Sequence, residues 1–438
     1  MRIEELHLQN FRGFRDLKLT LPPDLAVFIG VNGSGKSSIL DSIAIFLSQF
    51  LSEISEFLIS GFDLTEDDIN INSNITHNSL SISTDEDVKL VWESFIDRYK
   101  KHRLKSYIFK QPINSYAVQI VENITVLPES SLPILVYYQT NRILINSALL
   151  QDVSEDAQEQ NQFDAYKKAF SHTINDFRYF LYWFKEEEEY ENEVRLREDT
   201  NFRNPRLQII RKVLETFLEN FPNAEFSDLH IVRANSQREG GIRRLSKPSL
   251  VIKKNGKNFK LDQLSDGEKT LLMIVVDIAR RLAILNPSIT NPSELLEKGT
   301  GIILIDEIDL HLHPQWQRIV IPSFRKTFPN CQFIVTTHSP QVLSGVNREN
   351  VFILEDSEIV ETPHTFGRDS NSILSEVMGV EKRPVKMQER IDKCFEMIDN
   401  DNLEEAKLEL QKLSESLGNN DPDMIQAYTL IDFLNRVE

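Results

Sequence analysis

Two short motifs carry residue types that handle phosphate groups and metal ions. GVNGSGKS, at residues 30–37, follows an apolar run and precedes an amphipathic stretch of helical period. Glycines let the chain curl so that backbone N–H groups point at phosphate oxygens, and the following helix adds positive potential. A lysine supplies a mobile charge, and a serine hydroxyl is a ligand that Mg²⁺ accepts. The motif predicts ATP-phosphate contacts by Asn32, Gly33, Ser34, Gly35, Lys36, Ser37 and Ser38, with Ser37 also a metal ligand.

The second motif, IILIDE at residues 302–307, is an apolar run that ends in two carboxylates. Such a run is typical of a buried parallel strand, which presents polar residues at its C-terminal edge. We expect Asp306 to hold Mg²⁺ through water. We expect Glu307 to orient or deprotonate the water that attacks the phosphate. Two solvated acids at a strand end are the alternative interpretation.

LSDGEK, at residues 264–269, directly precedes a stretch whose apolar residues recur at helical spacing. Ser265 suits a helix N-cap, so an ordinary helix start is one interpretation. In the order of its motifs, however, the chain resembles the ABC-type ATPases, and within them the SMC and RecF branch. In that family the signature caps the γ-phosphate of ATP held by the opposite subunit, which assigns this role to Ser265, Gly267 and Glu268. Asp266 stands where glycine is usual, as in members that are not transporters.

The same resemblance assigns roles to further residues. Asp309 lies in the family's D-loop, which crosses the dimer interface, and His338 corresponds to the switch histidine that senses the γ-phosphate. Gln139 corresponds to the glutamine-loop residue, with an ordinary strand exit as the alternative. Asn10 and Arg12 lie in a turn near the nucleotide, with a turn arginine paired to a surface acid as the alternative.

These residues require an α/β fold to bring them together, namely an ABC-type P-loop ATPase head with a mixed sheet, a helical insertion lobe and a short C-terminal helical segment. Local patterns predict an antiparallel strand pair at 3–8 and 16–21 and a hairpin around 255–256. The predicted domains are an ATPase lobe at 1–145, with an insertion at 52–131 that includes a helix around 88–101, a helical lobe at 146–225, a second ATPase lobe at 226–365 and C-terminal helices at 366–438.

Composition limits the partners. The 49 basic and 67 acidic residues give a formal net charge of −18, which argues against a broad nucleic-acid surface. A DNA contact would be local, and a solvated hairpin is the alternative for the one basic segment that could provide it. That segment contains Arg233, Arg238, Arg243, Arg244, Lys247, Lys253, Lys254, Lys257 and Lys260. Two cysteines and the lack of a leader or an 18-residue apolar stretch predict a cytoplasmic protein without a membrane partner.

The chain as a whole resembles the RecF-like AAA-type ATPases of bacterial antiphage operons, which include the PtuA subunits of Septu systems. The resemblance lies in LQNFRGF at 8–14, DIARRLAILNP at 277–287, HLHP at 311–314 and DSNSILSEVMGV at 369–380. It implies ATP and Mg²⁺ as cofactors and a head-to-tail homodimer or larger assembly. It also implies a partner nuclease of the HNH type that the ATPase controls, without nuclease activity of its own. A RecF-like repair or clamp ATPase that binds DNA directly is the alternative, and a transporter subunit would need a more usual signature.

Overall fold

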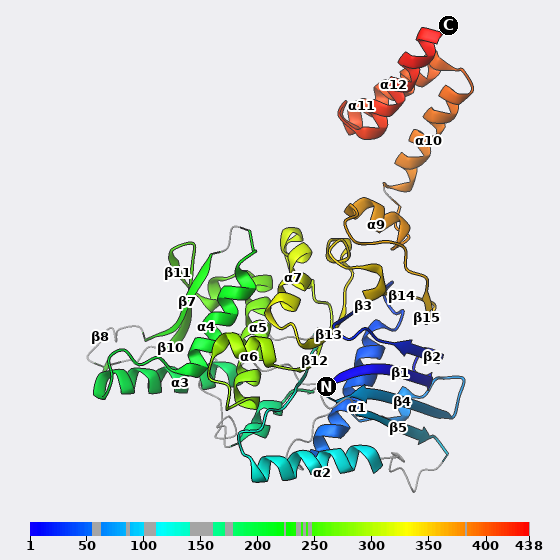
Figure 1. Cartoon of the computed structure of the whole chain (residues 1–438). Helices are drawn as coiled ribbons and strands as arrows, with labels where there is room; N and C mark the ends of the chain where they lie inside the picture. Colours follow the sequence, from blue (N-terminus) through cyan, green and yellow to red (C-terminus); the bar gives the residue numbers. More distant parts are fainter. Residues whose placement is uncertain are drawn as a thin grey trace. The chain divides into compact units, whose positions relative to one another are not determined.

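The computed structural model describes residues 1–54, 63–84, 88–99, 111–140, 161–170, 178–222, 225–233, 238–239, 242–243, 248–381 and 383–437. The chain divides into two compact units, Met1–Arg368 and Asp369–Glu438 (Figure 1). The first unit contains the phosphate-handling motifs, and the second is helical in its described part.

A six-stranded sheet forms the centre of the first unit. Its strands are β3 (Leu25–Gly30), β6 (Ile134–Tyr138), β12 (Gly301–Ile305), β13 (Cys331–Thr336), β14 (Val351–Glu355) and β15 (Glu358–Val360), in the order β15-β14-β3-β13-β12-β6. Neighbouring strands are parallel except β15, which is antiparallel to β14. Every residue of β6, β12 and β13 is buried, as expected for strands covered on both faces. The predicted α/β fold with a mixed sheet is confirmed.

Two long helices pack in this core. Helix α1 (Lys36–Ile54) begins inside the phosphate motif, and α5 (Asp266–Leu285) begins inside the signature. In the part of the chain that the structure describes, α1 is the one helix long and apolar enough to cross a membrane, with a window of mean hydropathy 1.2. That window is 67% buried, because its apolar residues pack inside the unit. The apolar composition of α1 is therefore explained by its burial in the core of the first unit.

A four-stranded antiparallel sheet contains the N-terminus. It consists of β1 (Arg2–Phe11), β2 (Phe14–Thr20), β4 (Ile75–Ser83) and β5 (Lys89–Asp97), in the order β2-β1-β4-β5. The predicted pairing of the first two strands is confirmed. The predicted helix around 88–101 is wrong, because Leu90, Trp92 and Ile96 are buried with the period of two that defines a strand with one covered face. Residues 52–131 thus add two strands to the N-terminal sheet.

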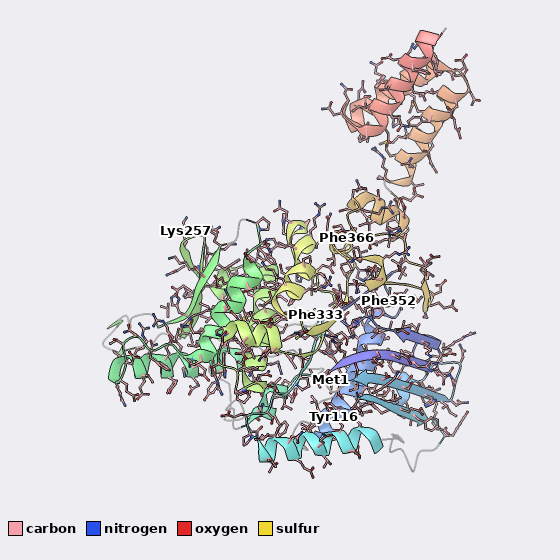
Figure 2. All side chains as sticks on the ribbon, viewed as in Figure 1. Met1, Tyr116, Lys257, Phe333, Phe352 and Phe366 are labelled. Carbon is pink, nitrogen blue, oxygen red and sulfur yellow. The ribbon has the colours of Figure 1, made fainter. Side chains whose placement is uncertain are left out.

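The rest of the first unit adds helices α2 (Gln111–Val126), α3 (Arg178–Arg197), α4 (Pro205–Leu218), α6 (Pro292–Lys298), α7 (Pro314–Thr327) and α8 (Pro340–Leu343). A three-stranded sheet consists of β7 (Phe226–Arg233), β10 (Pro248–Lys254) and β11 (Lys257–Lys260), and β8 (Arg238–Glu239) pairs with β9 (Ile242–Arg243). The predicted hairpin is confirmed, with Asn255 at φ 48° and Gly256 at φ 77° in its turn. Lys257 lies at the exposed tip (Figure 2).

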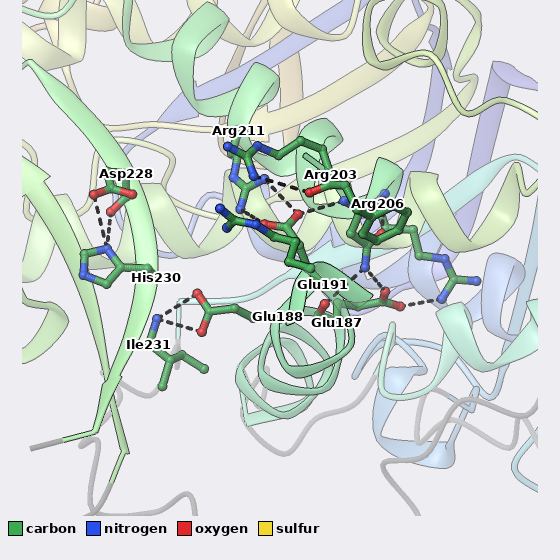
Figure 3. Close-up of polar contacts among 12 residues, drawn as sticks. Glu187, Glu188, Glu191, Arg203, Arg206, Arg211, Asp228, His230 and Ile231 are labelled. Atoms are coloured by element: carbon green, nitrogen blue, oxygen red, sulfur yellow. Dashed lines mark hydrogen bonds and ion pairs between the residues drawn. The ribbon is translucent and has the colours of Figure 1, made fainter. Parts of the chain in front are cut away.

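The aromatic and acidic stretch of α3 forms packed structure. Phe180, Trp183 and Phe184 are buried, so this aromatic face of α3 is part of the core. On the same helix the Glu188 carboxylate accepts the Ile231 N–H of β7 with both oxygens at 3.1 Å (Figure 3).

Two neighbouring glutamates of α3 hold the start of α4. Arg211 donates to both oxygens of Glu191 at 3.0 and 3.2 Å, and Arg206 pairs with Glu187 at 2.7 Å (Figure 3). Burial raises the pKa of Glu188. Burial also opposes ionisation of Glu191, but the Arg211 hydrogen bonds keep the Glu191 pKa below its usual value. The acidic run therefore fastens α3 to β7 and α4.

The second unit contains α9 (Ser370–Glu376), α10 (Val385–Asp399), α11 (Leu403–Leu417) and α12 (Pro422–Val437). The three long helices match the sequence prediction. Their common core is formed by Ile391, Cys394, Ile398, Ala406, Leu410, Leu413, Met424, Ala427 and Ile431. Because each long helix contributes to one apolar cluster, this unit has a core of its own.

Candidate nucleotide site

The strand register brings the motifs to one edge of the central sheet. Ile305 at the end of β12 pairs with Val335 of β13 and Tyr138 of β6, and Thr336 pairs with Phe28 of β3. Parallel strands end at a shared edge, so the residues that follow them are neighbours in space. The phosphate loop, Gln139, the two carboxylates and His338 all follow these strand ends. Gln139 is half-buried directly after β6.

The phosphate loop is curled around its own lysine. Lys36 is buried and donates from Nζ to the carbonyl oxygens of Gly30 at 2.9 Å and Val31 at 3.0 Å. Burial lowers the pKa of Lys36, while the nearby carboxylates act in the opposite direction. Gly35 has φ 103°, and a Cβ there would meet the Phe14 ring at 2.5 Å. Glycine is therefore required at this position by both backbone and space.

Oxygen atoms of the kind that bind Mg²⁺ lie in and beside the phosphate loop. Ser37 Oγ donates to the Asp306 carboxylate at 3.0 and 3.3 Å. The Ser34 hydroxyl is buried without a hydrogen-bond partner in the described structure, as a polar atom reserved for a ligand would be. Hydroxyl and carboxylate oxygens are the donors that Mg²⁺ accepts, so these residues fit a Mg²⁺-nucleotide.

The end of β13 interlocks with the segment after β12. Glu307 is half-buried with φ 49°, a conformation that side chains rarely adopt, and its N–H donates to Thr336 Oγ1 at 2.7 Å. Asp309 accepts a hydrogen bond from the Thr337 hydroxyl. His338 lies half-buried at the turn that follows. Glu307, Asp309 and His338 therefore lie in two segments that hydrogen bonds hold together.

A glutamine that sequence analysis missed closes this region. Gln317 of α7 accepts from Ser339 Oγ at 2.8 Å and donates from Nε2 to the Leu312 carbonyl at 3.0 Å. It therefore links the segment after Asp309 with the turn that contains His338. Nothing in the local sequence marks this role, because Ser339 lies 22 residues further along the chain and meets Gln317 only through the packing of the fold.

The signature residues make their contacts within their own chain. Ser265 is exposed and caps α5, since its Oγ accepts the Glu268 N–H at 3.4 Å while the Glu268 carboxylate accepts the Ser265 N–H at 3.0 Å. Glu268 also pairs with Lys254 of the basic hairpin at 2.5 Å. Gly267 is buried, and a Cβ there would meet the His311 carbonyl oxygen at 2.2 Å. The helix-start interpretation is therefore satisfied, and α5 packs directly on the loop that follows Asp309.

Asn10 lies near the end of β1, and Arg12 lies in the turn that follows, beside α1. Arg12 pairs with Asp41 at 2.6 Å and Asp68 at 2.8 Å, and its Nη1 reaches Ser38 Oγ at 3.4 Å. The Asp68 and Asp41 side chains are 8% and 19% exposed, so they are not the surface acids of the alternative interpretation. Burial opposes the charge of Arg12, but the hydrogen bonds and charges of both aspartates raise its pKa.

Sequence analysis did not identify Asp41 and Asp68 as the partners of Arg12. Asp41 lies one helical turn after Ser37 and Ser38, a spacing that places it on the same side of α1. That spacing is a signal that could have identified it. Asp68 lies within residues 52–131, which the sequence analysis assigned to an insertion, so no local pattern connected it to Arg12.

A buried ionic cluster connects the site edge to α5. The Tyr138 hydroxyl donates to Asp277 at 2.8 Å, and the Tyr138 carbonyl accepts the Asp306 N–H at 2.8 Å. Arg280 and Arg281 pair with Asp277 at 3.1 and 2.7 Å. Burial opposes the charge of Asp277, but the two arginines keep its pKa below its usual value. Within the described residues, no group of three or more His, Cys, Asp or Glu side chains could hold a further metal ion.

Comparison with known proteins agrees with this geometry. A family model described as "AAA domain" matches residues 5–221, and one described as "AAA domain, putative AbiEii toxin, Type IV TA system" matches residues 138–344. The retron Ec83 probable ATPase of Escherichia coli is 31% identical over 88% of this chain and 77% of its own length. The retron Vc95 probable ATPase of Vibrio cholerae serotype O1 biovar El Tor is 30% identical over 89% and 81%.

More distant matches point to related proteins. A Septu protein PtuA from Bacillus mycoides is 31% identical over 36% of this chain and 22% of its own length. Among solved structures, an SMC head bound to the C-terminal winged-helix domain of ScpA aligns over 82% of this chain and 98% of that one, with a TM-score of 0.45 and 16% identity. The assignment below rests on the retron relatives.

A phosphate loop at the end of β3, paired carboxylates at the end of β12 and a helix that begins in a signature define an ABC-type P-loop ATPase. The chain is an ATPase of this class. It belongs to the family of AAA ATPases of bacterial antiphage defence that the two retron ATPases represent.

Proposed function

We propose that this chain is the regulatory ATPase of a defence complex, in which ATP and Mg²⁺ bind between two head-to-tail copies and the nucleotide state controls a partner nuclease. The observation that carries the proposal is the Ser37–Asp306 contact of 3.0 Å, with Glu307 next in the chain. It supports one complete set of phosphate, metal and base residues per chain. A DNA-repair role has no comparable support in the described geometry.

Within each proposed site, the backbone of residues 30–38 and Lys36 bind the phosphates. Ser37 binds Mg²⁺ directly and Asp306 binds it through water, and the ion supplies neutralisation of developing phosphate charge. Glu307 orients the attacking water, and His338 contacts the γ-phosphate. Gln139, Asn10 and Arg12 are assigned to the nucleotide edge of the same site, where Arg12 reaches Ser38.

The second copy contributes the signature. Ser265 is exposed at the positive end of α5, where its hydroxyl and the helix dipole can meet the γ-phosphate of a neighbouring chain. Gly267 and Glu268 form the N-terminal end of α5, and Asp309 lies on the loop against which this end packs. The proposed self-assembly therefore uses residues already fixed within each chain.

The partner is proposed to be an HNH-type nuclease, since the relatives are named for retron and Septu systems and this chain is assigned no nuclease activity. Direct DNA contact is a secondary proposal. It rests on Lys253, Lys257 and Lys260, which are exposed on the hairpin, while the arginines of the basic segment lie outside the described side chains. A cytoplasmic location remains a prediction.

Glu307→Gln tests the assigned chemistry. The amide keeps the shape of the side chain but cannot accept a proton, so turnover should fall by about 10² to 10⁴ while ATP binding persists. Phosphate release and nucleotide titration measure the two quantities. Wild-type turnover in this variant would remove Glu307 from its role.

Mixing two inactive variants tests whether the site is shared. In a head-to-tail dimer, a Lys36→Ala chain supplies an intact signature to the loop of a Ser265→Ala chain, so an equal mixture should regain about a quarter of wild-type turnover. Each variant alone is the control. If mixing restores nothing although mass measurement shows mixed dimers, the shared-site proposal fails.

A further inference from the structure

Thr336 contacts both residues that follow β12, Asp306 and Glu307. It is the last residue of β13 and is 0% exposed. Its hydroxyl donates to Asp306 Oδ1 at 2.5 Å and accepts the Glu307 N–H at 2.7 Å. The Thr336 hydroxyl oxygen is therefore hydrogen-bonded to two consecutive residues, Asp306 and Glu307, at the end of the neighbouring strand β12.

The direction of these two bonds is fixed by the chemistry of the groups. A hydroxyl has one proton and two lone pairs, and an ionised carboxylate accepts only. The Thr336 proton is committed to Asp306, and a lone pair then receives the Glu307 N–H. This arrangement fixes the peptide between Asp306 and Glu307 in an orientation where Glu307 has φ 49°. Such a backbone conformation persists when its surroundings hold it in place.

The neighbouring threonine has a different partner. Successive side chains at a strand end point to opposite sides, so two adjacent threonines can serve two segments. Thr337 donates to Asp309, whereas Thr336 contacts the Asp306 carboxylate and the Glu307 backbone N–H. The two hydroxyls are therefore distinguishable by mutation.

We infer that Thr336 is a positioning residue for ATP hydrolysis, whose hydroxyl sets the metal-binding carboxylate and the water-orienting carboxylate relative to each other. The inference rests on the proposed roles of Asp306 and Glu307. It adds a residue that touches neither nucleotide nor metal and acts through those two. Loss of the hydroxyl should slow the chemical step more than it weakens ATP binding.

Thr336→Val and Thr336→Ser, made in the full chain, separate the hydroxyl from the shape of the side chain. Valine keeps the branched shape and loses both hydrogen bonds, so kcat should fall about 10- to 100-fold with KM for ATP changed by less than about 3-fold. Serine keeps the hydroxyl and should stay within about 3-fold of wild type.

Thr327 supplies a matched control. This threonine at the end of α7 is also 0% exposed, but its hydroxyl has no hydrogen-bond partner in the described structure. Thr327→Val should therefore leave kcat unchanged. Wild-type kcat in Thr336→Val would overturn the inference, as would a serine variant as slow as the valine variant, or a rise in KM without a fall in kcat.

The double variant with Glu307→Gln tests whether Thr336 acts through its neighbour. When two residues act together, the effects of their mutations on rate are not additive. Thr336→Val should therefore slow the Glu307→Gln enzyme by less than about 3-fold. Full additivity would overturn this part. If Glu307→Gln alone keeps wild-type turnover, the role proposed for Glu307 fails separately. Thr336→Val should then still raise the Mg²⁺ concentration for half-maximal rate through Asp306, and an unchanged Mg²⁺ dependence would overturn the inference.

Discussion

At the scale of single residues, burying the charged side chains of α5 would destabilise the fold if they were not paired with one another and hydrogen-bonded. Asp277, Arg280 and Arg281 are all buried, and Tyr138 adds a hydrogen bond to the carboxylate. Charges removed from water are stable only when paired closely and hydrogen-bonded. Because Tyr138 also accepts the Asp306 N–H, this cluster fixes α5 against the strand end that carries the site.

Asp277→Asn should lower the free energy of unfolding of the first unit by about 3–5 kcal/mol, because two buried arginines lose their counter-charge. Asp266→Asn is the control on the same helix. Its side chain is 53% exposed and pairs with Lys269, so it should change stability by less than about 1 kcal/mol. Thermal and urea unfolding measure both, and equal effects would contradict the assigned importance of the cluster.

The Asp277 cluster also predicts how the stability of the fold changes with pH. Its pKa in the folded chain lies below the unfolded value, so its contribution is fully present above the unfolded pKa of about 3.9. The contribution is lost as pH falls through the folded pKa. Acid unfolding of Asp277→Asn should therefore show a weaker pH dependence in this range than that of the intact chain. An unchanged dependence would show that other carboxylates determine acid stability.

At the scale of elements, the start of α5 and the loop after Asp309 are packed backbone to backbone. Gly267 is buried at this contact, and its missing Cβ leaves room for the His311 carbonyl. The glycine of a signature is therefore required here by packing within one chain, whatever it does for a second copy. Ser265 is a cleaner probe of the shared site because it is exposed.

Gly267→Ala should lower the thermal stability of the chain without ATP by about 1–3 kcal/mol, since the new methyl overlaps a backbone oxygen. Gly345→Ala is a milder comparison, because a Cβ there would lie 3.2 Å from its nearest atom, the Arg318 carbonyl oxygen. Unfolding followed by circular dichroism distinguishes them. A stable Gly267→Ala chain that lost only ATP turnover would instead assign this glycine to nucleotide contact.

At the scale of the whole molecule, the two units have separate cores. Residues Asp369–Glu438 form a small unit around the cluster of α10, α11 and α12. A domain of this size has little apolar area to bury, so each core residue accounts for a large part of its stability. The first unit has a larger core of its own, so we expect its stability not to depend on that cluster.

Leu410→Ala should unfold the second unit selectively, because removing a buried leucine costs about 2–5 kcal/mol. Hydrogen exchange should show lost protection in α10–α12 and unchanged protection in α1 and α5. Leu408, two residues earlier on α11 and 60% exposed, is the control, and Leu408→Ala should change neither unit. Lost protection throughout the chain would show that the units unfold together.

The sequence by itself determined the nucleotide motifs, the strands and helices that carry them, and the helical C-terminal segment. Gly35, Lys36, Ser37 and Asp306 are predicted as site residues from the sequence because phosphate and metal chemistry demand those residue types at fixed spacing. Apolar runs and helical periods are local properties, so they could be recognised without knowing any contact.

Only the tertiary structure decided what joins these parts. The strand β5, predicted as a helix, pairs with β4, and its charged residues Lys89, Glu93 and Asp97 lie on its less buried face. Thr336, Gln317 and Asp277 each have a partner on another element, namely the Asp306 carboxylate, the Ser339 hydroxyl and the Tyr138 hydroxyl. Hydrogen bonds between distant segments leave no periodic pattern in either one, because each depends on how the sheet register and helix packing align both partners.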